Sequence, residues 1–177
     1  MSRSVLLLRA VNVSGRNRVP MAELRDALTE AGELREVSTY IASGNIVCAT
    51  PDDVVGACAH VRRVIHERFD VDTPVIHRSH EELRAAMATH PFVDPVENLL
   101  HAMFLEGDPR DGAVDALRER LVAGEEIALV GRELWIHYAD GGVHTTKLTK
   151  AVLDRALGVA GTARNLRTVQ KLVDLTA

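Results

Sequence analysis

The sequence predicts an α+β fold made of two similar halves, and three features of the chain predict it. First, the chain opens on an uninterrupted apolar run, Val5 to Leu8, which is the pattern of a strand buried on both faces. Second, short β-branched runs and amphipathic stretches follow one another in the order β-α-β-β-α-β. Third, the same order starts again at Leu100, about 95 residues later, which indicates a structural repeat.

In the first half, local signals predict two helices and three further strands. Met21, Leu24 and Leu28 recur at helical spacing and Gly32 suits the position just past a helix end, which predicts a helix over 20–31. Gly44 separates two β-branched runs and can adopt a positive φ, so it predicts a hairpin turn. The other elements predicted here are strands over 37–41, 46–49 and 73–77 and a helix over 52–69.

The second half repeats this order. Its predicted elements are strands over 100–105, 127–130 and 134–138 and helices over 111–122 and 145–157. The chain ends in a helix over 165–175 where a final strand would be expected, so any strand at Gly161 to Ala163 must be very short.

Between the halves, a helix over 79–89 leads into His90 to Pro95, whose prolines exclude regular structure. The β-α-β-β-α-β order is that of a ferredoxin-like unit. We therefore expect two ferredoxin-like subdomains in tandem, over residues 1–78 and 99–177, with a connecting helix and linker over 79–98. We expect the second subdomain to be modified at its C-terminus.

The composition, with 46% apolar and 26% charged residues, is that of a globular protein. The first apolar run ends at Arg9, too soon for a signal peptide, and no stretch approaches the roughly 18 apolar residues of a membrane span. We therefore expect a cytoplasmic protein without a membrane partner. Cys48 and Cys58 show no metal-type or redox-type spacing, and we expect both to be buried as small hydrophobic residues.

The net charge of −4 is distributed unevenly along the chain. Residues 1–18 carry +4, residues 141–177 carry +4, and residues 19–140 carry −12. If the two ends lie together, they form a positive patch that would attract an anionic ligand. The alternative is two separate solvated faces.

Several strings in the sequence resemble one family. Leu7 to Gly15 (LLRAVNVSG) and Thr39 to Asn45 (TYIASGN) are similar to the LLRGINVGG and TYIQSGN strings of the bacterial domain-of-unknown-function family numbered 1697. Segments 90–92, 147–149 and 162–172 resemble its NPF, SKLT and TxRNWNTVxKL strings, so the resemblance spans essentially the whole chain. It implies one compact protein of two ferredoxin-like subdomains, without an established activity.

The sequence departs from that family at a few positions. Ala10 and Ser14 stand where the family usually has Gly, which makes the N-terminal loop bulkier. Leu166 and Arg167 stand where it has Trp-Asn, which removes an indole that could stack on a base.

Candidate anion-binding residues gather at the two basic ends. The polar loop after the first strand leads to a helix N-terminus, where N–H groups and the helix dipole favour negative charge. The residues that we expect to contact an anion are Arg9, Asn12, Arg16, Asn17, Ser43, Asn45, Lys147, Arg164 and Asn165. The alternative is that these residues have structural roles. The loop arginines would then pair with acids of residues 19–140, Ser43 to Asn45 would form a turn required by the backbone, and Asn165 would cap a helix.

Three classes of function fit these features. The first is a module that binds a phosphorylated or other anionic small molecule at the basic patch. The second is an enzyme in which Lys147 or Arg9 stabilises charge, although no base or nucleophile is apparent. The third is a protein- or RNA-interaction module, which the net acidity disfavours. The eight histidines lack ligand-type spacing, so no metal is expected, and no cofactor or oligomeric state is indicated.

The charge distribution predicts that residues 1–18 and 141–171 converge. The expected separation of the Asn12 and Lys147 Cα atoms is below about 25 Å, roughly the diameter of a small domain. The distance is to be measured in a crystal structure, and a larger value would exclude a shared site.

Overall fold

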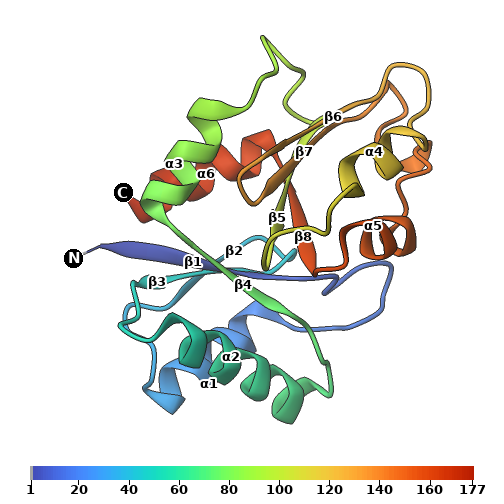
Figure 1. The fold of residues 1–177 in the computed structure, drawn as a ribbon. Helices are drawn as coiled ribbons and strands as arrows, with labels where there is room; N and C mark the ends of the chain where they lie inside the picture. The colour runs from blue at the N-terminus through green and yellow to red at the C-terminus, as the bar shows by residue number, and fades with distance from the viewer. Residues whose placement is uncertain (1) are drawn as a thin grey trace. The chain divides into compact units, whose positions relative to one another are not determined.

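The computed structural model describes residues 2–177 as a mixed α+β protein with two four-stranded antiparallel sheets (Figure 1). Six α-helices and one short 3₁₀ helix lie within this part of the chain. The chain divides into two compact units, one holding the residues up to Leu83 together with Leu172–Ala177, the other holding Arg84–Lys171. None of the helices in residues 2–177 has the length and apolar character needed to span a membrane.

The first sheet has the strand order β2-β3-β1-β4. Its elements are β1 (Arg3–Leu8), α1 (Met21–Ala31), β2 (Ser38–Tyr40), β3 (Asn45–Ala49), α2 (Val54–Phe69) and β4 (Val75–Ser79), followed by α3 (His80–Thr89). β1 pairs antiparallel with both β3 and β4. Each residue from Val5 to Leu8 is 0% exposed, which confirms the prediction of a strand buried on both faces.

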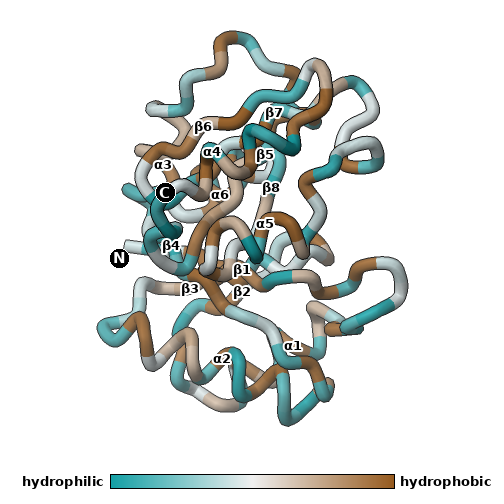
Figure 2. The backbone as a smooth tube through the Cα atoms, turned by 45° about the vertical axis from the view of Figure 1, so that its right-hand side comes forward, coloured by the Kyte–Doolittle hydropathy of each residue, from teal (hydrophilic) through white to brown (hydrophobic). Residues whose placement is uncertain are grey.

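Two helices cover one face of this sheet (Figure 1). Leu6 and Leu8 of β1 share a core with Leu24 and Leu28 of α1 and with Val61 of α2. Hydrophobic and hydrophilic residues alternate along both helices (Figure 2), as the sequence periodicity predicts.

Residues at the helix ends define where these helices start and stop. α1 ends at Gly32, which adopts φ 72° as predicted. α2 begins after Asp53, whose carboxylate accepts a hydrogen bond from the Gly56 N–H. Cys48 lies in the core, where burial raises the pKa of its thiol, whereas Cys58 is only half-buried, contrary to the prediction.

The second sheet has the strand order β6-β7-β5-β8. Its elements are β5 (Leu100–Leu105), α4 (Ala113–Arg118), β6 (Glu126–Val130), β7 (Glu133–His137), α5 (Lys150–Leu157) and β8 (Gly161–Asn165), followed by α6 (Leu166–Thr176). Met103, Leu117, Leu134, Ile136 and Leu157 share its core. Tyr138 belongs to the same core, and burial raises its pKa to about 12.

Three elements of the second unit differ from their predicted bounds by two residues or more. α4 is about half as long as predicted. The N–H groups of Arg120 and Leu121 donate to carbonyls three residues earlier, so the α-helix gives way there to a tighter 3₁₀-type turn. α5 starts at Lys150 instead of residue 145, because Thr149 caps it. β8 spans Gly161–Asn165 and equals β4 in length, so the prediction that any strand at Gly161 to Ala163 must be very short is wrong.

The two sheets repeat one register. Ser4 of β1 pairs with Ser79 of β4, and His101 of β5 pairs with Asn165 of β8. Ser79 and Asn165 each end their strand and accept a backbone hydrogen bond that caps the following helix, at 3.1 and 2.9 Å.

The residue before each of these caps is also the same in both sheets. Arg78 and Arg164 are buried, and each donates to the carbonyl of the residue before it. The repeat therefore extends from the order of the elements to equivalent side chains.

Gly44 allows the β2–β3 turn to approach the end of β1. Its φ is +85°, and a Cβ at this position would lie 2.7 Å from the Leu8 Cβ and 2.9 Å from the Val11 Cγ2. We expect Gly44→Ala to lower the free energy of unfolding by about 3 kcal/mol, from left-handed strain and a steric clash. Urea unfolding measures this loss.

Gly15→Ala is the matched control. Gly15 has φ +75° but no atom near the position of an added Cβ, so only the conformational cost of about 1 kcal/mol is expected. Equal losses in the two variants would contradict the steric part of the interpretation.

Candidate functional site

The N-terminal loop, residues 9–20, is closed by its own hydrogen bonds. The Asn12 N–H donates to the Asn17 carbonyl at 3.0 Å, and the Arg16 N–H donates to the Val13 carbonyl at 2.9 Å. The Asn12 side chain accepts from the Val19 N–H at 2.8 Å and donates to the Val19 carbonyl at 2.9 Å. The loop is thus a small hairpin with a defined shape.

The amides of Asn12 and Asn17 are both used within the protein. The Asn12 Nδ2 also donates to the Ala42 carbonyl at 2.8 Å, which joins the loop to the β2–β3 turn. The Asn17 Nδ2 donates to the Ala10 carbonyl at 2.9 Å. These contacts assign both asparagines to the framework of the loop.

The backbone of the loop is strained. Positive φ angles occur at Ala10 (52°), Asn12 (54°), Ser14 (49°) and Asn17 (50°), besides Gly15. Left-handed backbone costs a residue with a Cβ about 1–2 kcal/mol, least for Asn. Strain of this kind concentrates at functional sites, so the loop is a candidate site on backbone geometry as well as on charge.

Two arginine side chains of the loop have no partner within residues 2–177. Arg16 and Arg18 are exposed, and within residues 2–177 neither forms an ion pair or a side-chain hydrogen bond. Both lie close in sequence to the start of α1, where Pro20 is the N-cap and provides no side-chain cap. The loop therefore combines unpaired positive charge with an uncapped helix N-terminus.

A hollow of ≈ 540 Å³ lies beside these groups. It is lined by Asn12, Arg18, Val19, Pro20, Met21, Ile41 and Ala42. Ile41 was expected in a strand, but it lies in the β2–β3 turn at φ 49° and is 47% exposed. The predicted site residues did not include Arg18, Met21 or Ile41.

The other candidate residues of the first unit, Arg9, Ser43 and Asn45, are buried or half-buried. Asn45 is fully buried, and its Nδ2 donates to the Tyr40 carbonyl at 2.8 Å and to the Ser43 Oγ at 3.3 Å. Arg9 is half-buried, and its N–H and carbonyl both bond to the Thr73 hydroxyl. Of the candidates in this unit, Arg16 is the exposed cation.

The three candidates of the second unit occupy different environments. Lys147 is exposed and precedes the Thr149 cap, so it does not open a helix as predicted. Arg164 is 6% exposed and donates to the Thr162 Oγ1 at 2.8 Å, and burial lowers its pKa to about 10, which leaves it charged at neutral pH. Asn165 caps α6 through the Thr168 N–H.

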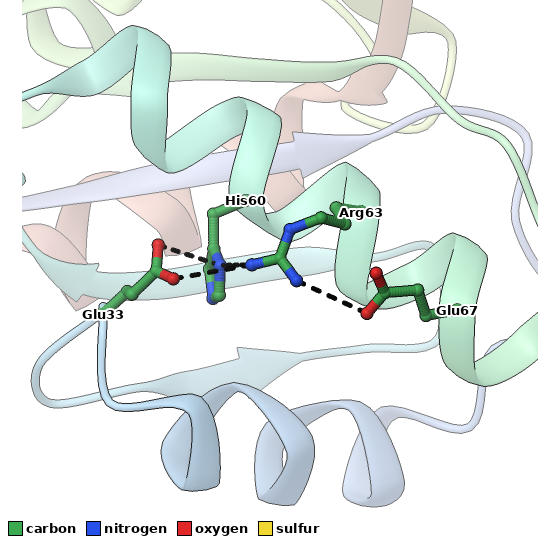
Figure 3. A network of polar contacts seen from close by, with 4 residues as sticks. All are labelled: Glu33, His60, Arg63 and Glu67. Carbon is green, nitrogen blue, oxygen red and sulfur yellow. Dashed lines mark hydrogen bonds and ion pairs between the residues drawn. The ribbon is translucent and has the colours of Figure 1, made fainter.

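A separate polar network joins the segment after α1 to α2 (Figure 3). His60 is 4% exposed, and its Nδ1 lies 2.9 Å from the Glu33 carboxylate and 2.9 Å from the Arg63 guanidinium. Arg63 also contacts Glu67 at 3.4 Å. The Nδ1 atom cannot donate to Glu33 and accept from Arg63 at once, so the two partners compete for it.

This network resembles a carboxylate–histidine pair only in part. A general base uses the second ring nitrogen to reach substrate, but the His60 Nε2 is buried and lacks a hydrogen-bond partner within residues 2–177. The network therefore ties two elements together. In the same part of the chain, no three His, Cys, Asp or Glu side chains are placed to hold a metal ion.

Comparisons with known proteins give a family of unknown function and a similar solved structure. The model of a family described as "Protein of unknown function (DUF1697)" matches residues 1–135. The chain is similar in structure to the conserved bacterial protein SP0830 from Streptococcus pneumoniae, with a TM-score of 0.76 and 24% identity over 99% of each chain. None of the curated proteins matches the sequence.

The strain in the loop predicts the effect of restoring glycine. Ala10→Gly is expected to raise the free energy of unfolding by up to about 1 kcal/mol, because Gly adopts φ 52° without the Cβ penalty. The control is Ala22→Gly, an exposed position in α1, where the same change is expected to cost about 0.5–1 kcal/mol. Chemical unfolding measures both, and a loss of stability in Ala10→Gly would contradict the assignment of strain.

Proposed function

The chain belongs to the DUF1697 family of proteins of unknown function, and we propose that it binds a phosphorylated or other anionic small molecule at the N-terminal loop. The observation that carries the proposal is the pair of exposed arginines, Arg16 and Arg18, which are unpaired within residues 2–177 and come shortly before the uncapped start of α1 in the sequence, with Arg18 lining the hollow.

Electrostatics favour an anion at this position. A cation near a helix N-terminus is unfavourable by about 0.3–1 kcal/mol unless negative charge compensates it. Glu23 lies in the first turn of α1, but neither arginine pairs with it within residues 2–177. A bound phosphate or carboxylate would supply the missing charge and accept hydrogen bonds from both arginines.

The hollow beside Arg18 has the size of a small-molecule site. Its volume of ≈ 540 Å³ falls within the roughly 300–1,000 Å³ of ligand pockets. Met21 and Ile41 offer apolar contacts for the remainder of the ligand. The strained loop is held by hydrogen bonds that do not involve the arginine side chains, so the site is preorganised.

Two finer statements are part of the same proposal. The β-α-β-β-α-β order and the strand orders β2-β3-β1-β4 and β6-β7-β5-β8 support a ferredoxin-like assignment for each unit. A contribution of Lys147, Arg164 and Asn165 to the anion site stays a prediction, tested by the distance measurement given above.

The binding test uses adenosine monophosphate as the phosphorylated probe and adenosine as its uncharged control. We expect the phosphate form alone to raise the thermal midpoint of the native protein and to shift the NMR signals of the Ala22 and Glu23 amides. Replacing both Arg16 and Arg18 by Ala is expected to abolish the shifts of the Ala22 and Glu23 amides, because it removes the unpaired charges. Arg25→Ala, an exposed arginine of α1 outside the hollow, is the matched control and should leave them intact.

Two results would overturn the proposal. One is the absence of any response to the phosphate in the native protein, and the other is an unchanged response in the double variant. Arg9→Met distinguishes binding from support: loss of the ligand response with an unchanged midpoint places Arg9 in the site, whereas a lower midpoint with an intact response assigns it to the fold.

A further inference from the structure

A groove of ≈ 490 Å³ lies between α4 and α5, two helices that lie side by side in the second unit (Figure 1). We infer that this groove is a binding site for a small organic anion whose charged group meets arginines and whose hydrocarbon part covers its apolar lining. It shares no residue with the N-terminal loop, so the two sites can be tested independently.

Three arginines surround the groove. Arg110, Arg120 and Arg155 are exposed and line it together with Asp111 and Glu119. Within the described residues, none of the three arginines forms an ion pair or a side-chain hydrogen bond, even with these neighbouring acids. The rim carries three positive and two negative charges, and its guanidinium groups retain their full capacity to bind a carboxylate or phosphate.

The position of Arg110 is built into the fold. Its N–H donates to the Leu157 carbonyl at 2.9 Å, which holds the residue at the end of α5. Its guanidinium lies over Gly158, where a Cβ would come within 2.6 Å of the Arg110 Nε. The backbone hydrogen bond places Arg110 at the groove, and Gly158 leaves space for its guanidinium in this position.

The groove also has an apolar lining. It consists of small side chains from both helices, namely Ala113, Ala116, Ala151, Val152 and Ala156. Short side chains leave the volume open, and their methyl groups gain free energy when a hydrocarbon surface covers them. The combination selects a molecule with both a charged end and an apolar body, and it disfavours inorganic phosphate or a neutral hydrocarbon alone.

Phenyl phosphate is a probe with both properties, and inorganic phosphate and benzyl alcohol each lack one. In NMR titrations of the full chain, we expect phenyl phosphate to produce saturable shifts at the Ala113, Ala116, Ala151 and Val152 amides. Neither control compound should do so at the same concentrations.

Variants separate the two parts of the site. Replacing Arg110 and Arg155 together by Ala should weaken binding about tenfold or more, as expected for lost charge-assisted hydrogen bonds. Ala151→Leu fills the groove at an exposed helix position and should abolish binding while the protein stays folded. The control is Arg118→Ala, which removes an exposed α4 arginine that is paired with Asp115 and lies outside the groove.

The outcomes decide the proposal. The proposal is supported if the saturable shifts persist in Arg118→Ala and disappear both in Ala151→Leu and in the variant that lacks Arg110 and Arg155. Absent shifts, shifts unaffected by Ala151→Leu, or equal binding of inorganic phosphate would overturn it. Because Arg16 and Arg18 are not involved, a failure here leaves the N-terminal site unaffected, and the reverse also holds.

Discussion

The pairing of a fully buried central strand on both of its edges is the constraint on which the first unit depends. Every backbone N–H and C=O of such a strand needs a partner, so β1 determines where β3 and β4 lie, with Leu7 opposite both Asn45 and Ile76. The strand then ends where Leu8 meets the Gly44 carbonyl. The N-terminal loop starts at that point, and its position follows from the sheet. β5 has the same place in the second sheet.

Polar residues of the N-terminal loop divide into two groups with different tasks. Asparagine amides bond to backbone carbonyls of the loop and of the β2–β3 turn, which keeps a strained backbone in one conformation. The side chains of Arg16 and Arg18 have no such task within residues 2–177 and are exposed. A preorganised anion site requires a rigid frame with free cations. The asparagine hydrogen bonds also explain why the loop tolerates positive φ angles at Ala10 and Ser14.

The acidic net charge of the protein does not conflict with anion binding at defined places. Acids are paired elsewhere on the surface, as in Arg62–Asp72, Arg118–Asp115 and Arg167–Glu97, where exposed ion pairs contribute little to stability. Arginines beside the two hollows remain unpaired within the described chain. Local charge beside a concave surface, and not the total, decides what such a surface attracts.

The sequence by itself determined the elements whose signals are local. The apolar runs of β1 and β5, the periodicity of α1 and α2, and the caps at Gly32 and Asp53 all act through neighbours in the chain. It also identified the arginine-rich loop and the family strings.

Only the tertiary structure decided the rest, because it depends on partners distant in sequence. The length of β8 follows from its pairing with β5, and the burial of Asn45 follows from the place of β3 beside β1. The contact of Arg110 with Gly158 joins residues that no local pattern connects. Sequence periodicity reports which side of an element is apolar, whereas the role of a polar side chain depends on which atoms folding brings within hydrogen-bond distance.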